Sequence, residues 1–311
     1  MTQTIGRTAT RIGVIPLAGN IGAEITGIEA GRPLDDEVVA ELRQALLTYR
    51  VVFLRGQDLD YPRQVAFAER LGPLTLGHPT LASPPEQPLL EEIDSQKGGK
   101  ANYWHTDVTF VDRPPAFTLL HAIVIPPVGG DTLWANTVSA YHSLPAELRD
   151  LAVKLRVLHT NDFDYARTFN RGERVDPALL AAHEEFISTV YETEHPLVRL
   201  HPETQEPSLM LGGFAKTVLG FNPQASRDLI RLLQDYATRP EQTVRWRWRE
   251  GDLAIWDNRA TQHYAVADYG TAHRRGERVT VAGPVPVGLD GRPSVAVRGD
   301  ASEYYAGGAN H

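Results

Sequence analysis

Alternation of apolar and basic residues in one short segment constrains the fold more than any other feature of this sequence. In "TVRWRWREGDLAIWDN" (residues 243–258), Val244, Trp246 and Trp248 alternate with arginines, and a glycine precedes a second apolar run. Successive side chains of a strand point to opposite faces. The segment therefore predicts a strand with one apolar face, a turn at Gly251, and a second strand.

Strand-like runs also dominate the middle of the chain. We expect strands at residues 51–56, 89–93, 103–110, 116–124 and 131–136, with the last strand near 278–283. Helical patterns do not alternate regularly with these runs, which argues against a parallel α/β fold. The arrangement predicts a mainly β protein with flanking helices, built as a sandwich or a jelly roll.

Four segments predict helices. Residues 32–50 begin with acidic residues and repeat apolar positions at Val39, Leu42 and Leu46, which is typical of an amphipathic helix. The other helices are expected at 62–71, stopping at Gly72, near 145–155, with Pro145 at the start, and at 222–240, with Asn222 as cap and Pro223 in the first turn.

Two further segments are expected to be mobile. Residues 1–10 have no apolar pattern and predict a flexible N-terminus. Residues 160–190 are mixed and polar, so little of this segment can be buried, and we expect a lid over a functional site. No internal repeat or long linker divides the chain, so we expect a single domain over residues 1–311.

Composition excludes several classes of protein. The chain has 311 residues and no cysteine, so disulfides, thiolate metal sites and a cysteine nucleophile are excluded. Its net charge is −8 and no block of five or more like charges occurs, so we expect neither a nucleic-acid nor a membrane partner. The N-terminus lacks an apolar stretch of signal-peptide length, so we expect a cytoplasmic protein.

One short motif suggests a metal site. In "NYWHTDVTF" (102–110), His105 and Asp107 would share one face of the expected strand and be aimed at one point. The candidate third ligand is His263, in "WDNRATQHYAVADYG", while Asp257 is an alternative carboxylate for which we expect a turn or supporting role. Two histidines and one carboxylate are the pattern of non-haem Fe(II) oxygenases. A purely structural role is the competing interpretation for each histidine, and we expect it for His159, His195 and His201.

Two arginines strengthen the interpretation as an oxygenase. A 2-oxo acid that chelates iron supplies electrons for oxygen activation, and its far carboxylate needs a fixed, always-charged partner such as arginine. Arg274 and Arg278 are an even number of positions apart, so on one strand they would share a face and hold two anions. For Arg275 and His273, in "HRRGER", we expect solvated turn positions.

Further motifs occur in order around these residues, namely "WHTDVTF", "GGDTLW", "VRWRW" and "IWDNRATQHYA". Together they resemble the taurine dioxygenase family of Fe(II)/2-oxoglutarate oxygenases, from about residue 12 to about residue 288. "VYETEHPLVRLHP" and "NRATQHYAVADYGT" are most similar to the branch that cleaves alkyl sulfate esters. The resemblance implies a double-stranded β-helix (jelly roll) core, one catalytic domain, and a homodimer or homotetramer.

The resemblance also implies which residues bind the cofactors. His105, Asp107 and His263 would ligate Fe(II), with 2-oxoglutarate and O2 as cosubstrates. Thr132, in "GGDTLW", and Arg274 would bind the C5 carboxylate of 2-oxoglutarate.

The substrate residues follow from the same resemblance. His78, in "LGHPT", the backbone amide of Val108, and Arg278 would hold a sulfur oxyanion. Taurine-specific members have polar residues before "WHTD", placed to receive the amine. Here Ala101 cannot accept a hydrogen bond and Lys100 would repel an ammonium group. An alkyl sulfate or a sulfonate with an uncharged tail is therefore favoured, with oxidation of the carbon next to the sulfur group giving aldehyde plus sulfate or sulfite, succinate and CO2.

Other functions remain open from the sequence alone. A taurine or other sulfonate dioxygenase would use the same residues, and an aryloxyalkanoate dioxygenase could place a carboxylate on Arg278. A zinc hydrolase could use the same three ligands with a water in the fourth position. A non-catalytic sensor on a jelly-roll scaffold is a further alternative, because a fold does not determine a function.

Overall fold

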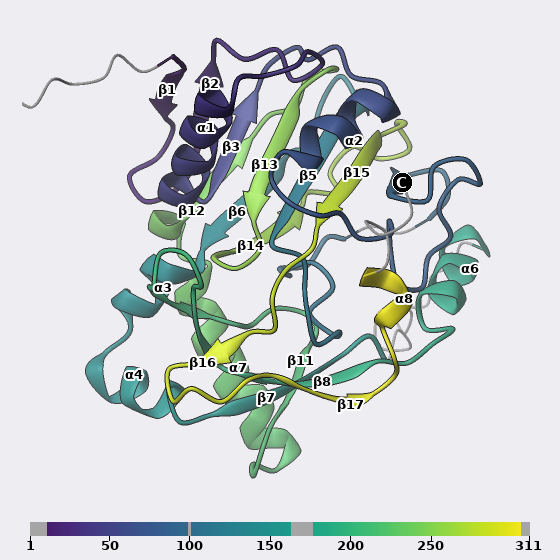
Figure 1. Ribbon diagram of the computed structural model, residues 1–311. Coiled ribbons are helices and arrows are strands. Elements are labelled where there is room, and N and C mark those ends of the chain that lie inside the picture. Colours follow the sequence, from purple (N-terminus) through teal and green to yellow (C-terminus); the bar gives the residue numbers. More distant parts are fainter. Residues whose placement is uncertain (1–10, 99–100, 163–176, 306–311) are drawn as a thin grey trace, which may run out of the picture.

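The computed structural model describes residues 11–98, 101–162 and 177–305. Residues 1–10, Lys100 and the centre of the predicted lid lie outside the described residues, so the expectations for them stay predictions. Within these ranges no helix is long and apolar enough to cross a membrane. The chain forms a large sheet that faces a smaller sheet, with two helices on the outer side of the large sheet (Figure 1).

The large sheet has seven strands in the order β1-β2-β3-β13-β5-β15-β4. Neighbouring strands are antiparallel except β2 and β3, which are parallel. The bounds are β1 Gly13–Pro16, β2 Ala23–Thr26, β3 Val51–Leu54, β4 Leu90–Asp94, β5 Phe117–Val124, β13 Leu253–Asp257 and β15 Arg275–Val281. Strands that are distant in sequence are therefore paired at the centre of the sheet.

The small sheet is antiparallel and has the order β12-β6-β14, with bounds β6 Thr132–Asn136, β12 Thr243–Trp246 and β14 Thr261–Ala265. A largely aromatic core fills the space between the sheets. The rings of Phe53 and Trp246 are stacked with centroids 4.1 Å apart, and Trp134 packs edge-on against Phe53. Two sheets closed over such a core form the jelly roll, or double-stranded β-helix, that the resemblance implied.

Helices α1 (Asp36–Tyr49) and α2 (Tyr61–Glu69) cover the outer face of the large sheet (Figure 1). Strand β3 shows the consequence. Val51 and Phe53 belong to the core between the sheets, whereas Val52 and Leu54 belong to the core under the helices. Each such side chain contributes about 1.5–3 kcal/mol through burial, so every position of this strand stabilises the fold.

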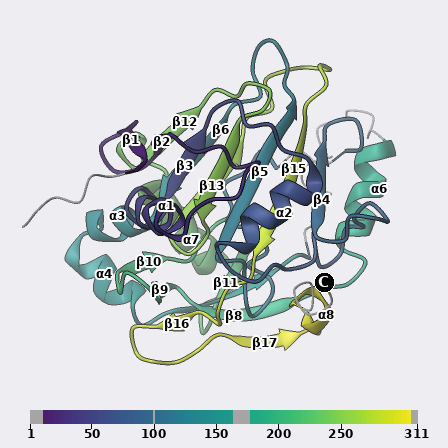
Figure 2. The ribbon, with the colours of Figure 1, turned by 45° about the horizontal axis from the view of Figure 1, so that its top comes forward.

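Two smaller sheets complete the described structure, in the orders β11-β7-β8-β17 and β10-β9-β16. Their bounds are β7 Arg156–Thr160, β8 Glu192–Pro196, β9 Val198–Leu200, β10 Pro207–Leu209, β11 Ala215–Val218, β16 Val287–Gly288 and β17 Val295–Arg298. The other helices are α3 Thr137–Ser143, α4 Ala146–Ala152, α6 Pro177–Phe186, α7 Pro223–Ala237 and α8 Ser302–Tyr305. Figure 2 shows α6 and α8 on the side of the molecule bordered by β4.

Most expected elements are confirmed, with small differences at their ends. Pro145 directly precedes α4, and the Asn222 side chain caps α7 by accepting a hydrogen bond from the Ala225 amide at 2.9 Å. The alternation in the opening segment also holds, because Val244 and Trp246 are buried and Arg245 is exposed. Helices α3 and α6 and the two smaller sheets were not predicted.

Two expectations about strands are wrong. Residues 103–110 are not a strand, because only His105 makes a bridge and residues 107–110 form a turn. At Val108 the φ angle is 51°, in the left-handed region that β-branched residues rarely adopt. The expected last strand corresponds to β15, but the short strands β16 and β17 follow it, and neither carries an alternating pattern long enough to be recognised in the sequence.

Candidate metal and anion site

The two histidines of the predicted triad are direct cross-strand partners. His105 pairs with His263 of β14, and their backbones exchange two hydrogen bonds, of 3.0 Å and 2.7 Å. Both rings lie on the same side of this pair, with centroids 4.1 Å apart. The pairing therefore extends the edge of the small sheet by one bridge and brings together residues that are distant in sequence.

Asp107 reaches the same point from the turn that follows His105, and it is held by the large sheet. Its Oδ2 accepts a hydrogen bond from Thr118 Oγ1 of β5 at 2.7 Å, and its Oδ1 accepts one from Arg278 Nη1 of β15 at 2.6 Å. Asn258 supports the arrangement by donating to the Thr118 hydroxyl at 2.7 Å. The carboxylate is thus oriented by the large sheet, whereas the imidazoles are oriented by the small sheet.

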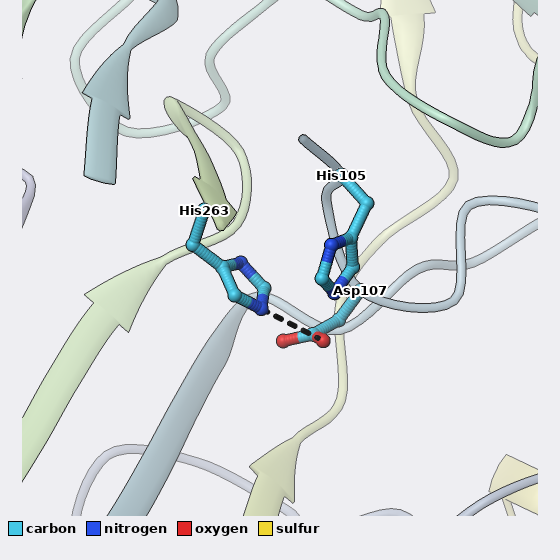
Figure 3. Close-up of side chains that lie close together, drawn as sticks. All are labelled: His105, Asp107 and His263. Atoms are coloured by element: carbon cyan, nitrogen blue, oxygen red, sulfur yellow. Dashed lines mark ion pairs between the residues drawn. The ribbon is translucent and has the colours of Figure 1, made fainter. Parts of the chain in front are cut away.

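Together the three side chains form a cluster suited to a metal ion. One ligand atom from each of His105, Asp107 and His263 lies within 4.8 Å of the other two, and all three residues are buried. Figure 3 shows the side chains converging, with the His263 Nε2 atom 3.6 Å from the Asp107 Oδ1 atom. Nδ1 of His105 bonds the Tyr103 carbonyl oxygen at 2.9 Å, which leaves Nε2 to face the cluster. Among the described residues this is the one group of three or more potential ligands with such geometry.

The protonation states of the cluster also suit a metal ion. Burial lowers the pKa of His105, and burial together with the neighbouring His105 lowers the pKa of His263 to about 3, so both imidazoles are neutral at pH 7. Burial alone would raise the pKa of Asp107, but Arg278, the two histidines and the Thr118 hydrogen bond together outweigh it and keep that pKa below its usual value. Two neutral imidazoles and one carboxylate are the donors that a divalent metal requires.

The cluster opens into a cavity of about 290 Å³. All eight predicted site residues line it, and they are His78, His105, Asp107, Val108, Thr132, His263, Arg274 and Arg278. Apolar side chains from several elements line the remaining wall, among them Leu81, Ile93, Ala101, Leu120 and Phe186. The cavity is therefore large enough for small molecules and combines a metal cluster, two cations and an apolar wall.

At one end of the cavity, Arg274 is held by neutral partners. Its Nε donates to the Gly130 carbonyl oxygen at 3.0 Å, and its Nη2 approaches the Thr132 hydroxyl at 3.4 Å. Trp248 donates its indole N–H to the same hydroxyl at 2.9 Å. No carboxylate of a described residue lies within ion-pair distance of Arg274, so its charge is available to an anion.

Arg278 lies between two carboxylates instead. Besides Asp107, its Nη2 forms an ion pair with Glu91, the residue directly opposite in the β4–β15 ladder. The Arg278 side chain is 7% exposed, so this pairing is largely shielded from water. Arg274 precedes β15, and the register shifts between Arg275 and Gly276, so the expectation of one shared strand face is wrong although both arginines reach the cavity.

His78 is neutral rather than charged. Burial and the neighbouring Arg278 lower its pKa to about 3. Its Nδ1 atom accepts hydrogen bonds from the backbone amides of Thr80 and Leu81, both at 3.1 Å. A neutral imidazole that accepts at Nδ1 carries its proton at Nε2, so His78 is a hydrogen-bond donor at neutral pH.

The other candidates from the sequence lie outside the cluster. Asp257 accepts hydrogen bonds from His201 and from the backbone amide and side chain of Arg259, which fits the expected turn position. His159 and His195 are buried and both bond to Thr109. Arg275 forms ion pairs with Glu92 and Glu277, and His273 forms a hydrogen bond with Asp94, so both positions are half-buried and hydrogen-bonded rather than solvated turns.

Sequence reasoning missed Glu91, Thr118 and Asn258. Glu91 stands in an ordinary strand pattern beside a second glutamate, and nothing local distinguishes it. The β4–β15 register alone places it against Arg278. Asn258 directly follows β13 in the quoted motif "IWDNRATQHYA", which was the one available signal.

Comparison with known proteins points to the same family that the sequence motifs resemble. A family model described as "Taurine catabolism dioxygenase TauD, TfdA family" matches residues 13–280. An alpha-ketoglutarate-dependent sulfate ester dioxygenase from Pseudomonas putida is 49% identical over 292 residues, covering 93% of this chain and 96% of that protein. An alkylsulfatase from Acinetobacter baylyi is 46% identical over 293 residues, covering 94% of this chain and 91% of that protein. Among solved structures, a taurine dioxygenase from Burkholderia xenovorans is similar with a TM-score of 0.80 and 41% identity, covering 97% of this chain and 100% of that chain.

Proposed function

Because this chain belongs to the TauD, TfdA family of taurine catabolism dioxygenases, we propose that it is an Fe(II)- and 2-oxoglutarate-dependent oxygenase of alkyl sulfate esters. It would hydroxylate the carbon that bears the sulfate oxygen. The resulting hemiacetal sulfate collapses to an aldehyde and sulfate, while 2-oxoglutarate and O2 are converted to succinate and CO2. The single observation that carries the proposal is the buried cluster of His105, Asp107 and His263 in a cavity that also holds two arginines.

The donor set fits Fe(II). His105, Asp107 and His263 all line the cavity, so a metal ion that they held could take further ligands from the cavity, as in iron oxygenases with two histidines and one carboxylate. Bound iron would supply the redox chemistry that activates O2. The protein supplies neutral imidazoles, an oriented carboxylate and a cavity beside them.

Arg274 and Thr132 are the residues we assign to the far carboxylate of 2-oxoglutarate. The guanidinium is fixed by the Gly130 carbonyl, and the Thr132 hydroxyl accepts the Trp248 N–H, which directs the hydroxyl proton elsewhere. A carboxylate there would receive charge-assisted hydrogen bonds in a buried environment. These are stronger than bonds between neutral groups, so this end supports tight and oriented binding of the cosubstrate.

Arg278, His78 and the Val108 amide are the residues we assign to the sulfate group. The neutral His78 can donate from Nε2, and Arg278 adds a cation on the same cavity wall. The left-handed φ of Val108 is a strained conformation, of the kind that clusters at ligand sites. These groups position the substrate rather than transfer a proton, so that one C–H bond lies near the metal.

The tail of the substrate would lie against apolar side chains. Ala101 lines the cavity near the cluster and offers no side-chain acceptor for an amine. This supports an alkyl tail rather than the ammonium group of taurine, whereas the similar solved structure is a taurine dioxygenase. A taurine or other sulfonate dioxygenase is therefore the second candidate.

A substrate screen distinguishes these functions. Succinate formation would be measured with Fe(II), 2-oxoglutarate and each of hexyl sulfate, 2-ethylhexyl sulfate, pentanesulfonate, taurine and a phenoxyacetate. We expect hexyl sulfate or 2-ethylhexyl sulfate to be turned over best, with oxygen consumption and sulfate release. Taurine as the best substrate would favour the second candidate, and sulfate release without oxygen would favour a zinc hydrolase.

The assembly and location of the protein stay predictions. The family resemblance predicts a homodimer or homotetramer, which light scattering after gel filtration measures directly.

A further inference from the structure

Glu91 stands in an unusual place for a protein that binds an anionic substrate. Its side chain is 14% exposed, it lines the cavity, and its Oε2 forms an ion pair with Nη2 of Arg278. Arg278 is the same residue to which the proposed function assigns the sulfate group. A carboxylate therefore occupies the side of the cation that an incoming anion needs.

The other two nitrogens of Arg278 are less accessible to an anion from the cavity. Nη1 donates to Asp107 at 2.6 Å, so that side is directed toward the metal cluster. Nε is buried and makes no hydrogen bond with a described residue. An anion that enters from the cavity would approach the guanidinium that Glu91 already pairs with, and the two anionic groups would repel each other.

We propose that Glu91 competes with the substrate for Arg278 and thereby sets the affinity of the enzyme for the anionic head group. This inference deepens the proposed function and rests on it. Binding requires the Glu91 carboxylate to lose its charge, because Arg278 already pairs with two carboxylates and a third anion at the same guanidinium would be repelled by both. Glu91 then takes up a proton from solvent when the sulfate group binds, and it releases that proton when the head group leaves.

The charges around Arg278 make such proton uptake feasible near neutral pH. Burial raises the pKa of Glu91 to about 6, although Arg278 lowers it in part. The other described groups that act on Arg278 include the two histidines of the cluster, and burial lowers the pKa of both. Asp107 has a lowered pKa, the pKa of His78 is lowered to about 3, and burial raises the pKa of Tyr304 to about 12.

The size of the effect follows from the protonated fraction. With a pKa of about 6, about one Glu91 in eleven is protonated at pH 7. If only this form binds the sulfate group, the apparent affinity is reduced about tenfold at pH 7, about twofold at pH 6 and about 100-fold at pH 8. The sign is definite: affinity for the sulfate ester rises as the pH falls toward 6.

The experiment compares Glu91→Gln with wild type, using iron-loaded enzyme, saturating 2-oxoglutarate and hexyl sulfate. We expect the KM for hexyl sulfate to fall about tenfold at pH 7 and to lose most of its dependence on pH between 6 and 8. The KM for 2-oxoglutarate should not change. The control is Glu277→Gln, which removes the same charge from the residue next to Arg278 without touching the cavity wall, and which should behave as wild type.

A second measurement needs no variant. Calorimetry of hexyl sulfate binding to the anaerobic enzyme, in buffers of different ionisation enthalpy, should show uptake of about 0.9 proton at pH 7. A KM that rises or stays the same in Glu91→Gln, or binding to wild type without proton uptake, would overturn the inference and leave the proposed function intact. No binding and no turnover of hexyl sulfate by either protein would remove the proposed function, and the inference with it.

Discussion

The two arginines that line the cavity have different partners. Arg274 is held by a carbonyl and a hydroxyl, and no described carboxylate forms an ion pair with it, so we expect its charge to be available to an anion at all times. Arg278 is already paired with Asp107 and Glu91, so we expect its charge to be available to an anion only after one of these carboxylates loses its own charge. A buried arginine can therefore be either a permanent anion site or a conditional one, and its charged neighbours decide which.

This difference suits the two ligands that we assign to these arginines. The cosubstrate 2-oxoglutarate is common to every turnover, and an unconditional site for it needs no selection. The substrate head group has to be distinguished from other anions, and a competing carboxylate raises the threshold for binding. An arginine thus contributes to affinity for the cosubstrate at position 274 and to selection of the substrate at position 278.

The largest expected effect comes from removing the centre that both ends share. For His105→Ala or Asp107→Ala we expect turnover to fall to the background level of metal-free protein with every substrate, because two ligands cannot hold the metal in its open geometry. Fe(II) binding and succinate formation are the measurements. His142→Ala, an exposed histidine on α3, is the matched control. Succinate release at the wild-type rate in either ligand variant would refute the metal assignment.

The next test concerns Arg274, the arginine without a carboxylate partner among the described residues. Truncating a buried, hydrogen-bonded charge costs about 2–5 kcal/mol, so Arg274→Ala should raise the KM for 2-oxoglutarate about 100-fold. The KM for hexyl sulfate should change little. Steady-state kinetics with each ligand varied in turn measures both values.

The complementary test concerns Arg278, the arginine that is paired with two carboxylates. Arg278→Ala should raise the KM for hexyl sulfate by a similar factor of about 100, because Glu91 and Asp107 are left without their cation. Affinity for 2-oxoglutarate should be nearly unchanged. If 2-oxoglutarate binding is lost instead, the roles of the two arginines are exchanged and the comparison fails.

The smallest effect is expected at Thr132. In Thr132→Val one hydrogen bond to the cosubstrate would be lost, and Trp248 would lose its acceptor. A single hydrogen bond contributes about 1 kcal/mol, which corresponds to roughly a fivefold higher KM for 2-oxoglutarate. An unchanged KM for 2-oxoglutarate would show that Arg274 alone holds the carboxylate.

Local patterns were sufficient for the elements that depend on neighbours in sequence. The cap at Asn222, the proline before α4 and the alternation around Trp246 each express short-range stereochemistry, so these elements are where we expected them. The segment around His105 has the same strand-like composition, yet it turns at Asp107. That turn depends on contacts with Thr118 and Arg278, and no local pattern encodes such contacts.

The sequence by itself determined the chemistry of this protein: which side chains could bind a metal, that no thiolate was among them, and that two arginines follow the third ligand. Only the tertiary structure decided which of these side chains lie next to one another. His105 lies opposite His263 through one bridge outside the strands, and Glu91 lies opposite Arg278 through the register of two strands far apart in sequence. The physical reason is that strand register is a property of the whole folded sheet, and a shift of one residue would turn Glu91 away from the cavity.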